Sequence, residues 1–272
     1  MKVIAAINGS LVSESCAFLA LNYAKKQGID MVLLHVKNHK DHLEDVQQSS
    51  QRLSDEATKM DLNCETVILK GHSRDAIPAY CNTIHIDTFF CSTRIQNRFM
   101  TDSFSEHLLK LNLNTNIAVV RIVHYQHFKT INSILLPIKE TKLSVYKFTF
   151  LASLASAYES DSHIYSVSIQ SKNDLARSTF SELRERSAHI NFELRHYVNL
   201  SRLMPFRLNI RHDFSTDETN SILKYMADHD SQLVIIGAKR LSFFSRFRGE
   251  PPIERLMRET STNLIAFYPK EH

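Results

Sequence analysis

The feature that most constrains this chain is a pattern of strands and helices that runs through it twice. Short apolar runs bounded by turn residues alternate with segments whose apolar residues recur every three to four positions. Both copies end alike, with Thr115-Asn116 and Thr262-Asn263 each directly before an apolar run. The 272 residues leave room for two domains of about 130 residues. Alternating strands and helices predict parallel sheets covered on both faces.

In the first half the apolar runs predict five strands and four helices. We expect the strands at 3–7, 31–36, 64–69, 88–91 and 117–122. The helices are expected at 12–27, 42–60, 73–82 and 105–111. The order is β-α repeated, which is typical of a doubly wound α/β domain.

The pattern starts again in the second half, with one irregularity. Strands are expected at 131–137, 163–169, 233–236 and 263–268, and helices at 143–158, 173–187, 221–227 and 253–259. Segments 192–200 and 206–211 both read as strands, and one of them is extra relative to the first half. We therefore predict domains at 1–124 and 128–272, the second carrying an additional strand or hairpin around 190–211.

Several short motifs carry a family resemblance through their order and spacing along the two halves. They are residues 4–10 (IAAINGS), 33–36 (LLHV) and 71–77 (GHSRDAI) in the first half, and 233–237 (LVIIG) with 252–256 (PIERL) in the second. In this arrangement the chain resembles the universal stress protein family. The resemblance implies two tandem, mostly parallel five-stranded sheets of strand order 3-2-1-4-5. It also implies that the last strands, 117–122 and 263–268, pair to form an intramolecular pseudo-dimer.

The resemblance also implies a nucleotide cleft, and here the sequence departs from the family. Members hold ATP with a Gly-x2-Gly-x9-Gly-Ser/Thr loop after the fourth strand, where glycine lets backbone N–H groups converge on phosphate. Residues 92–105 contain no glycine. In the second half Gly237 matches, but Arg240 replaces the second glycine, Gly249 falls one residue early, and Glu250-Pro251 replaces the final pair. We therefore expect ATP binding of the usual kind to be lost.

The ligand-binding candidates lie in the two loops that the resemblance places at each cleft. They are Asn8, Gly9, Ser10, Val36, Gly237, Lys239, Arg240, Arg246, Arg248 and Gly249. Four of these are cationic and lie within ten residues. They form either a solvated basic loop or an anion pocket in which guanidinium groups replace the lost backbone donors.

These observations favour a binding protein over an enzyme. We find no catalytic triad or nucleophile elbow, and expect a cytoplasmic universal-stress-type protein that acts in stress response or regulation by binding a ligand or partner. One alternative is a nucleotide-binding protein or weak ATPase that uses the basic loop. Another is a regulatory module that docks on a membrane transporter. We expect no cofactor in the main interpretation; ATP would be bound only in the first alternative. The sequence leaves open whether two copies of the chain form a homodimer.

Other classes are disfavoured by composition. The net charge of +4 is too small to indicate a nucleic-acid-binding protein. No apolar run is long enough to span a membrane. His35, His39 and His42 lie close in sequence, but no cysteine joins them, so we expect no dedicated metal site. The four cysteines lack CxxC spacing, which is typical of reduced thiols in a cytoplasm.

Overall fold

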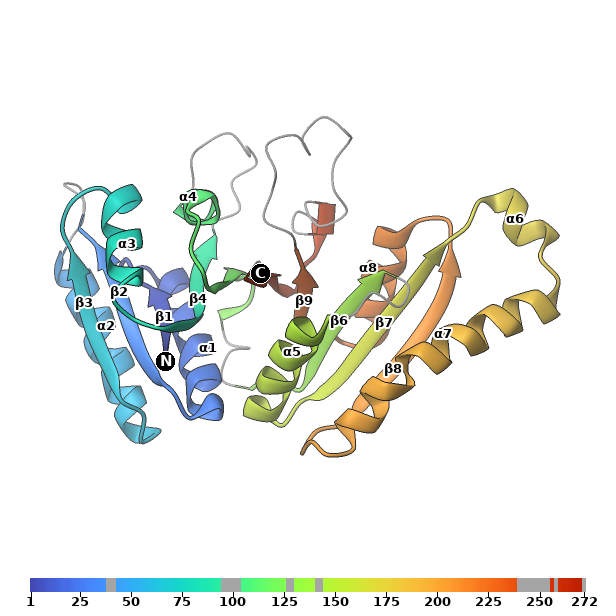
Figure 1. Ribbon diagram of the computed structural model, residues 1–272, viewed down its shortest axis with the longest axis horizontal. Coiled ribbons are helices and arrows are strands. Elements are labelled where there is room, and N and C mark those ends of the chain that lie inside the picture. Colours follow the sequence, from blue (N-terminus) through green and yellow to red (C-terminus); the bar gives the residue numbers. More distant parts are fainter. Residues whose placement is uncertain are drawn as a thin grey trace. The chain divides into compact units, whose positions relative to one another are not determined.

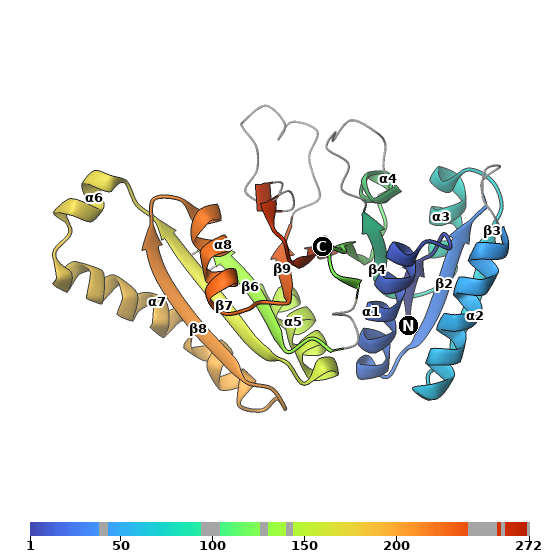
Figure 2. The ribbon, with the colours of Figure 1, turned by 180° about the vertical axis from the view of Figure 1, so that it is seen from behind.

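The computed structural model divides the chain into two compact units, drawn in Figures 1 and 2. It describes residues 1–37, 43–93, 104–125, 130–139, 144–238, 255–256 and 259–270. Unit 1 contains Met1–Thr130 and the end of the chain from Asn263, and unit 2 contains Ile131–Gly237 and the residues just before Asn263. Unit 1 therefore includes the last strand of the second sequence repeat.

In its described residues, unit 1 is a sheet of six strands flanked by helices. Its strands are β1 (Lys2–Ala6), β2 (Asp30–Val36), β3 (Cys64–Leu69), β4 (Ile86–Thr93), β5 (Asn116–Arg121) and β10 (Asn263–Tyr268). Its helices are α1 (Leu11–Gln27), α2 (Leu43–Lys59), α3 (Ser73–Cys81) and α4 (Phe104–Lys110). The strand order is β3-β2-β1-β4-β5-β10, in which the first five strands are parallel. The predicted 3-2-1-4-5 order is confirmed.

Unit 2 repeats most of this plan. Its strands are β6 (Ser133–Lys139), β7 (Asp161–Ile169), β8 (Leu208–Ser215) and β9 (Leu233–Gly237). Its helices are α5 (Val145–Tyr158), α6 (Lys172–Arg177), α7 (Phe180–Ser201) and α8 (Glu218–Asp228). The parallel order β9-β6-β7-β8 corresponds to strands 4-1-2-3 of unit 1.

The fifth strand of the second repeat pairs antiparallel with β5, as predicted. The register runs from Leu264 opposite Arg121 to Tyr268 opposite Ile117. Both Thr-Asn dipeptides have a structural role here. The buried Asn263 accepts hydrogen bonds at Oδ1 from the backbone N–H groups of Val123 (2.8 Å) and His124 (2.9 Å).

Asn116 makes the corresponding contact at the other end of the strand pair. Its Oδ1 accepts a hydrogen bond of 3.0 Å from the backbone N–H of Lys270, just beyond β10. Each asparagine therefore begins one strand and secures the chain where its partner strand ends. The repeated dipeptide belongs to the architecture of the strand pair.

The predicted strand at 192–200 is wrong, and so is the expected extra strand or hairpin around 190–211. Residues 192–200 lie in α7, and 206–211 corresponds to β8. A capping box starts the helix: the Thr179 side chain accepts from the Glu182 N–H, and the Glu182 carboxylate accepts from the Thr179 N–H. The buried residues follow helical spacing: Ile190, Leu194 and Tyr197. The alternation of apolar and polar residues within 192–200 arises because this segment contains only part of a longer apolar stripe along the helix.

Both units have continuous apolar cores. The strands next to the helices are buried on both faces, as expected for parallel sheets. Fully buried side chains include Ile4, Leu33, Phe89 and Phe90 in unit 1. In unit 2 they include Leu135, Phe150 and Ile164. All four cysteines are free thiols, and burial raises the pKa of Cys91 to about 12.

Candidate functional site

In a doubly wound sheet the binding cleft lies at the carboxyl ends of the strands, where the strand order reverses. In unit 1 this point is between β1 and β4, and in unit 2 it is between β6 and β9. The described parts of these loops are the turn after β1 in unit 1 and the end of β9 in unit 2. Both contain residues that the sequence predicts as ligand contacts.

The polar groups of the turn after β1 form hydrogen bonds with one another and with the start of α1. Asn8 Oδ1 accepts hydrogen bonds from the backbone N–H of Ser10 (3.1 Å) and from its hydroxyl (2.6 Å). Ser10 is the N-cap of α1 and accepts from the Ser13 N–H at 3.3 Å. Ser13 in turn donates to the Ser10 carbonyl and accepts from the Asn8 N–H. The predicted contacts Asn8 and Ser10 therefore form an N-terminal cap for α1.

Gly9 is required by packing as well as by backbone conformation. Its φ is +80°, in the region that glycine adopts readily. A Cβ placed there would lie 2.7 Å from Asp45 Cβ and 3.0 Å from Val46 N. The first turn of α2, which carries Glu44 and Asp45, thus occupies the space over this glycine. That side of the turn is close-packed and acidic.

His35 and Val36 end the second strand beside this turn. The His35 ring is buried, and its Nδ1 lies 2.9 Å from the carbonyl oxygen of Ile7, which joins the ends of β1 and β2. Val36 is half-buried at the end of β2. His39 and His42 lie outside the described residues. Within the described ranges, no group of three histidine, cysteine or acidic side chains is placed to hold a metal ion.

In unit 2, Gly237 is covered by a side chain that the sequence analysis missed. A Cβ on Gly237 would overlap the end of the Lys147 side chain, including its ammonium group. Lys147 lies in the first turn of α5, just after the N-cap Ser144. Its ammonium is thereby placed at the carboxyl end of β9. A lysine in the first turn of a helix is unfavourable with respect to the helix dipole. That unusual position is the sequence signal that could have pointed to Lys147.

The remaining unit 2 candidates lie outside the described residues. They are Lys239, Arg240, Arg246, Arg248 and Gly249. All five follow Gly237 in the sequence.

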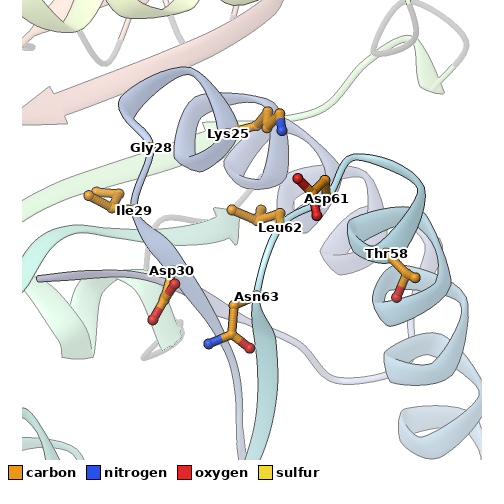
Figure 3. A pocket seen from close by; sticks show the side chains of 8 residues that line it. All are labelled: Lys25, Gly28, Ile29, Asp30, Thr58, Asp61, Leu62 and Asn63. Carbon is orange, nitrogen blue, oxygen red and sulfur yellow. The ribbon is translucent and has the colours of Figure 1, made fainter.

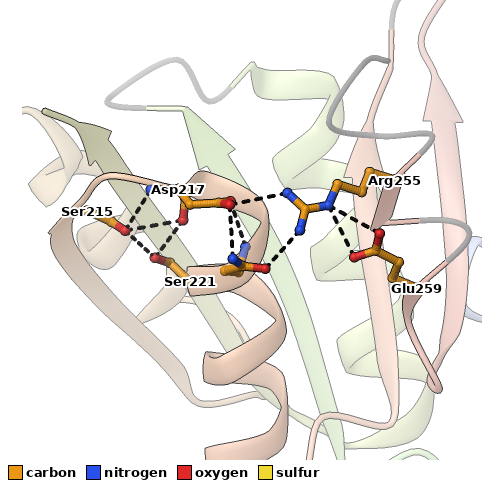
Figure 4. A network of polar contacts seen from close by, with 6 residues as sticks. Ser215, Asp217, Ser221, Arg255 and Glu259 are labelled. Atoms are coloured by element: carbon orange, nitrogen blue, oxygen red, sulfur yellow. Dashed lines mark hydrogen bonds and ion pairs between the residues drawn. The ribbon is translucent and has the colours of Figure 1, made fainter. Parts of the chain in front are cut away.

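Arg255, which follows these residues in the sequence, takes part in a network of polar contacts at the start of α8 (Figure 4). It donates to Asp217 Oδ2 (3.2 Å), to Asn220 Oδ1 (3.0 Å) and to Glu259 Oε2 (3.1 Å). Asp217 is the N-cap of α8. The pKa of the Asp217 carboxyl group is lowered mainly by the hydrogen bond from the Asn220 N–H, and also by Arg255. Two carboxylates thus neutralise Arg255.

A hollow in unit 1 lies at the opposite end of the sheet from the predicted cleft. Figure 3 shows it beside the C-terminal end of α1, with polar side chains from Lys25, Asp30, Asp61 and Asn63. Its volume is about 530 Å³. Asp30 begins β2 and Asn63 precedes β3, so this hollow is at the amino ends of the strands. None of the predicted site residues lines it.

Comparison with known proteins identifies the fold. No family model and no curated protein matches the sequence. Among solved structures, a universal stress protein from Archaeoglobus fulgidus matches with a TM-score of 0.64 at 13% identity, over 99% of this chain and 96% of its own. A functionally unknown protein from Pseudomonas aeruginosa matches with a TM-score of 0.64 at 12% identity, over 99% and 92% of the two chains.

The cytoplasmic domain of a prokaryotic cation chloride cotransporter matches as well. Its TM-score is 0.62 at 9% identity, over 99% of this chain and 95% of that domain. This chain therefore has the fold of a tandem universal stress protein. In the part of the chain that the structure describes, no helix combines the length and apolar composition needed to cross a bilayer.

Proposed function

We propose that this chain is a cytoplasmic protein of universal stress type that acts in stress response or regulation by binding, without catalysis. We further propose that neither unit holds ATP with the backbone cradle of that family. The observation that carries this proposal is that both cleft glycines are covered from within the protein. Gly9 lies under the first turn of α2, and Gly237 lies under the Lys147 side chain.

In unit 1 the chemistry of the turn disfavours a polyphosphate. A phosphate cradle needs backbone N–H groups that point at the ligand and a positive local field. Here the N–H groups of Asn8 and Ser10 already donate to side chains of the same turn. The acidic residues Glu44 and Asp45 in the adjoining first turn of α2 would repel phosphate oxygens.

A second candidate function is anion recognition by side chains in unit 2. Lys147 places an ammonium group where the family has its first loop glycine, and the sequence adds Lys239 and Arg240 directly afterwards. Cationic side chains can bind phosphate through charge-assisted hydrogen bonds without a glycine cradle. Such a site would make this chain a nucleotide-binding protein or weak ATPase of unusual construction.

A third candidate is a regulatory module that docks on a membrane transporter. It is supported by the likeness in fold to the cotransporter's cytoplasmic domain. Recovery of a transporter in a pull-down with the full chain would favour this candidate over a freely acting stress protein.

The first experiment is to denature freshly purified protein and assay the supernatant for nucleotide, then titrate native protein with Mg-ATP by calorimetry. The proposal expects no released nucleotide and no tight ATP binding. Binding that is lost in Lys147→Met but kept in the matched variant Lys172→Met would establish the side-chain anion site. Tight binding unaffected by Lys147→Met would show that Lys147 is not part of the site. Such binding would indicate a backbone cradle if it also survived replacement of Arg240 and Arg248 with alanine. Phosphate release during incubation with ATP would overturn the non-catalytic part.

A further inference from the structure

The connection between α7 and β8 presents an unusual group of apolar side chains. Leu203 is 83% exposed, Leu200 is 45% exposed and Met204 is 40% exposed. Single exposed apolar residues are common on protein surfaces. Three large ones within five consecutive residues are a local feature that invites an explanation. We refer to residues 200–207 as the α7–β8 tip.

The tip has a defined backbone conformation. Successive hydrogen bonds join the N–H of Arg202 to the Val198 carbonyl (3.3 Å) and the N–H of Leu203 to the Leu200 carbonyl (3.0 Å). The Met204 N–H likewise donates to the Ser201 carbonyl at 2.9 Å. The apolar side chains are thus held outward on a hydrogen-bonded turn, so little conformational entropy would be lost when they bind.

The other side of the tip is fastened to the sheet. The carbonyl of Arg207 accepts a hydrogen bond of 2.8 Å from the backbone N–H of Ser162, near the start of β7. The tip therefore lies at the amino end of β8, where α7 has come down the length of the sheet (Figures 1 and 2). In unit 2 this is the opposite end of the parallel strands from Gly237.

Along the chain, the charged residues of the tip are all basic, and the exposed Asp161 precedes Ser162 on the neighbouring strand. Arg195, Arg202 and Arg207 are exposed, and no acidic residue occurs between Glu193 and Asp213. Arg211 also falls in this stretch, but its charge is compensated by an ion pair with Asp213 at 3.2 Å. The tip therefore combines protruding apolar side chains with a rim of guanidinium groups.

We propose that the α7–β8 tip docks on an anionic membrane surface. Leu200, Leu203 and Met204 would enter the boundary between headgroups and acyl chains, while the arginines would remain at the lipid phosphates. Basic side chains near an anionic leaflet each strengthen binding by about fivefold.

A membrane fits this feature better than a protein partner does. A stable protein interface buries about 800 Å² on each partner, and such interfaces rest on anchors that fill matched pockets. Three side chains on a projecting turn supply far less than that area. A lipid interface requires no matched pocket and accepts a small apolar wedge with a basic rim.

The test is sedimentation of the full chain with vesicles of two compositions. One is phosphatidylcholine alone, and the other contains about 30% phosphatidylserine, which gives the surface a negative potential. We expect binding to the anionic vesicles, weakened by salt because the arginine contacts are exposed. Binding to neutral vesicles should be much weaker.

Two tip variants and one matched control make the test specific. Arg202→Gln with Arg207→Gln should weaken anionic binding about 25-fold. Leu203→Ser with Met204→Ser should weaken it at least about tenfold, because both apolar side chains are lost. The control, Phe192→Ser with Arg184→Gln, changes one exposed apolar and one exposed basic residue elsewhere on α7 and should bind like the original chain.

Three outcomes would overturn the proposal. They are absence of binding to either vesicle, equal binding to both, and tip variants that bind as well as the control. If the chain instead binds immobilised polyglutamate through the tip and ignores vesicles, the surface serves an acidic protein and the membrane proposal falls. Circular dichroism of each variant establishes that a loss of binding is not a loss of fold.

Discussion

Replacing Gly9 with alanine tests whether the first cleft glycine is held in place by the packing of α2. The matched control is Gly28→Ala, at the C-cap of α1 in the same unit. Both glycines have positive φ, +80° for Gly9 and +63° for Gly28. Only Gly9 is crowded, because a Cβ on Gly28 would meet nothing within 4 Å. The difference between the two variants therefore isolates the contact with α2.

The expected magnitudes follow from these two contributions. A left-handed backbone conformation costs an L-residue about 1–2 kcal/mol, and both variants bear this cost. At Gly9 the new Cβ would also lie 2.7 Å and 2.9 Å from two atoms of Asp45, one of them in the backbone. Forcing an extra methyl into such a packed site typically costs a further 1–3 kcal/mol or so. We therefore expect Gly9→Ala to lower the free energy of unfolding by about 2–5 kcal/mol and Gly28→Ala by about 1–2 kcal/mol.

The assay is urea unfolding of the full chain followed by far-ultraviolet circular dichroism. Both glycines lie in unit 1, so the same transition reports on both even if the two units unfold separately. The reasoning is refuted if the two variants agree within about 0.5 kcal/mol, since α2 would then not confine this turn.

Two further predictions concern the strand pair and an acid-sensitive cluster. Asn263→Ala removes side-chain hydrogen bonds to Val123 and His124 at a site only 1% exposed, and should lower the free energy of unfolding by about 3 kcal/mol. Asn116 is only half-buried, so Asn116→Ala should lower the free energy of unfolding by less than Asn263→Ala. Equal decreases for the two variants, measured by urea titration, would contradict this ranking. Burial, and then the neighbouring His229, lower the pKa of His163 from 6.5, so its contribution to stability is present above pH 6.5 and is lost as the pH falls through the lowered pKa. His163→Gln should therefore flatten the fall in unfolding free energy below pH 6.5, and an unchanged slope in urea titrations at several pH values would refute this.

Much of the fold could be predicted because its determinants are local. Apolar periodicity located most of the strands and helices, since buried strands and amphipathic helices impose different spacings. The failure at 192–200 has a physical cause. Within nine residues a helical stripe can imitate strand alternation, and the capping box at Thr179 lies outside that window.

The candidate site was less accessible to sequence reasoning. The sequence indicated which loops to inspect and which glycines were missing, because a phosphate cradle depends on residue type. It did not indicate that Asp45 lies over Gly9 or that Lys147 lies over Gly237. These contacts join separate elements, and their distances depend on how a helix packs against a strand end.

By itself the sequence determined that the chain contains two copies of one α/β pattern, because hydrophobic spacing and turn residues act within each segment. The family resemblance implied that the two last strands pair, but only the tertiary structure gave their antiparallel register and assigned β10 to unit 1. It also decided that Asn116 and Asn263 each secure the chain beyond the partner strand's end. The physical reason is that strand partners and buried amide contacts depend on positions more than 100 residues apart, which no local pattern encodes.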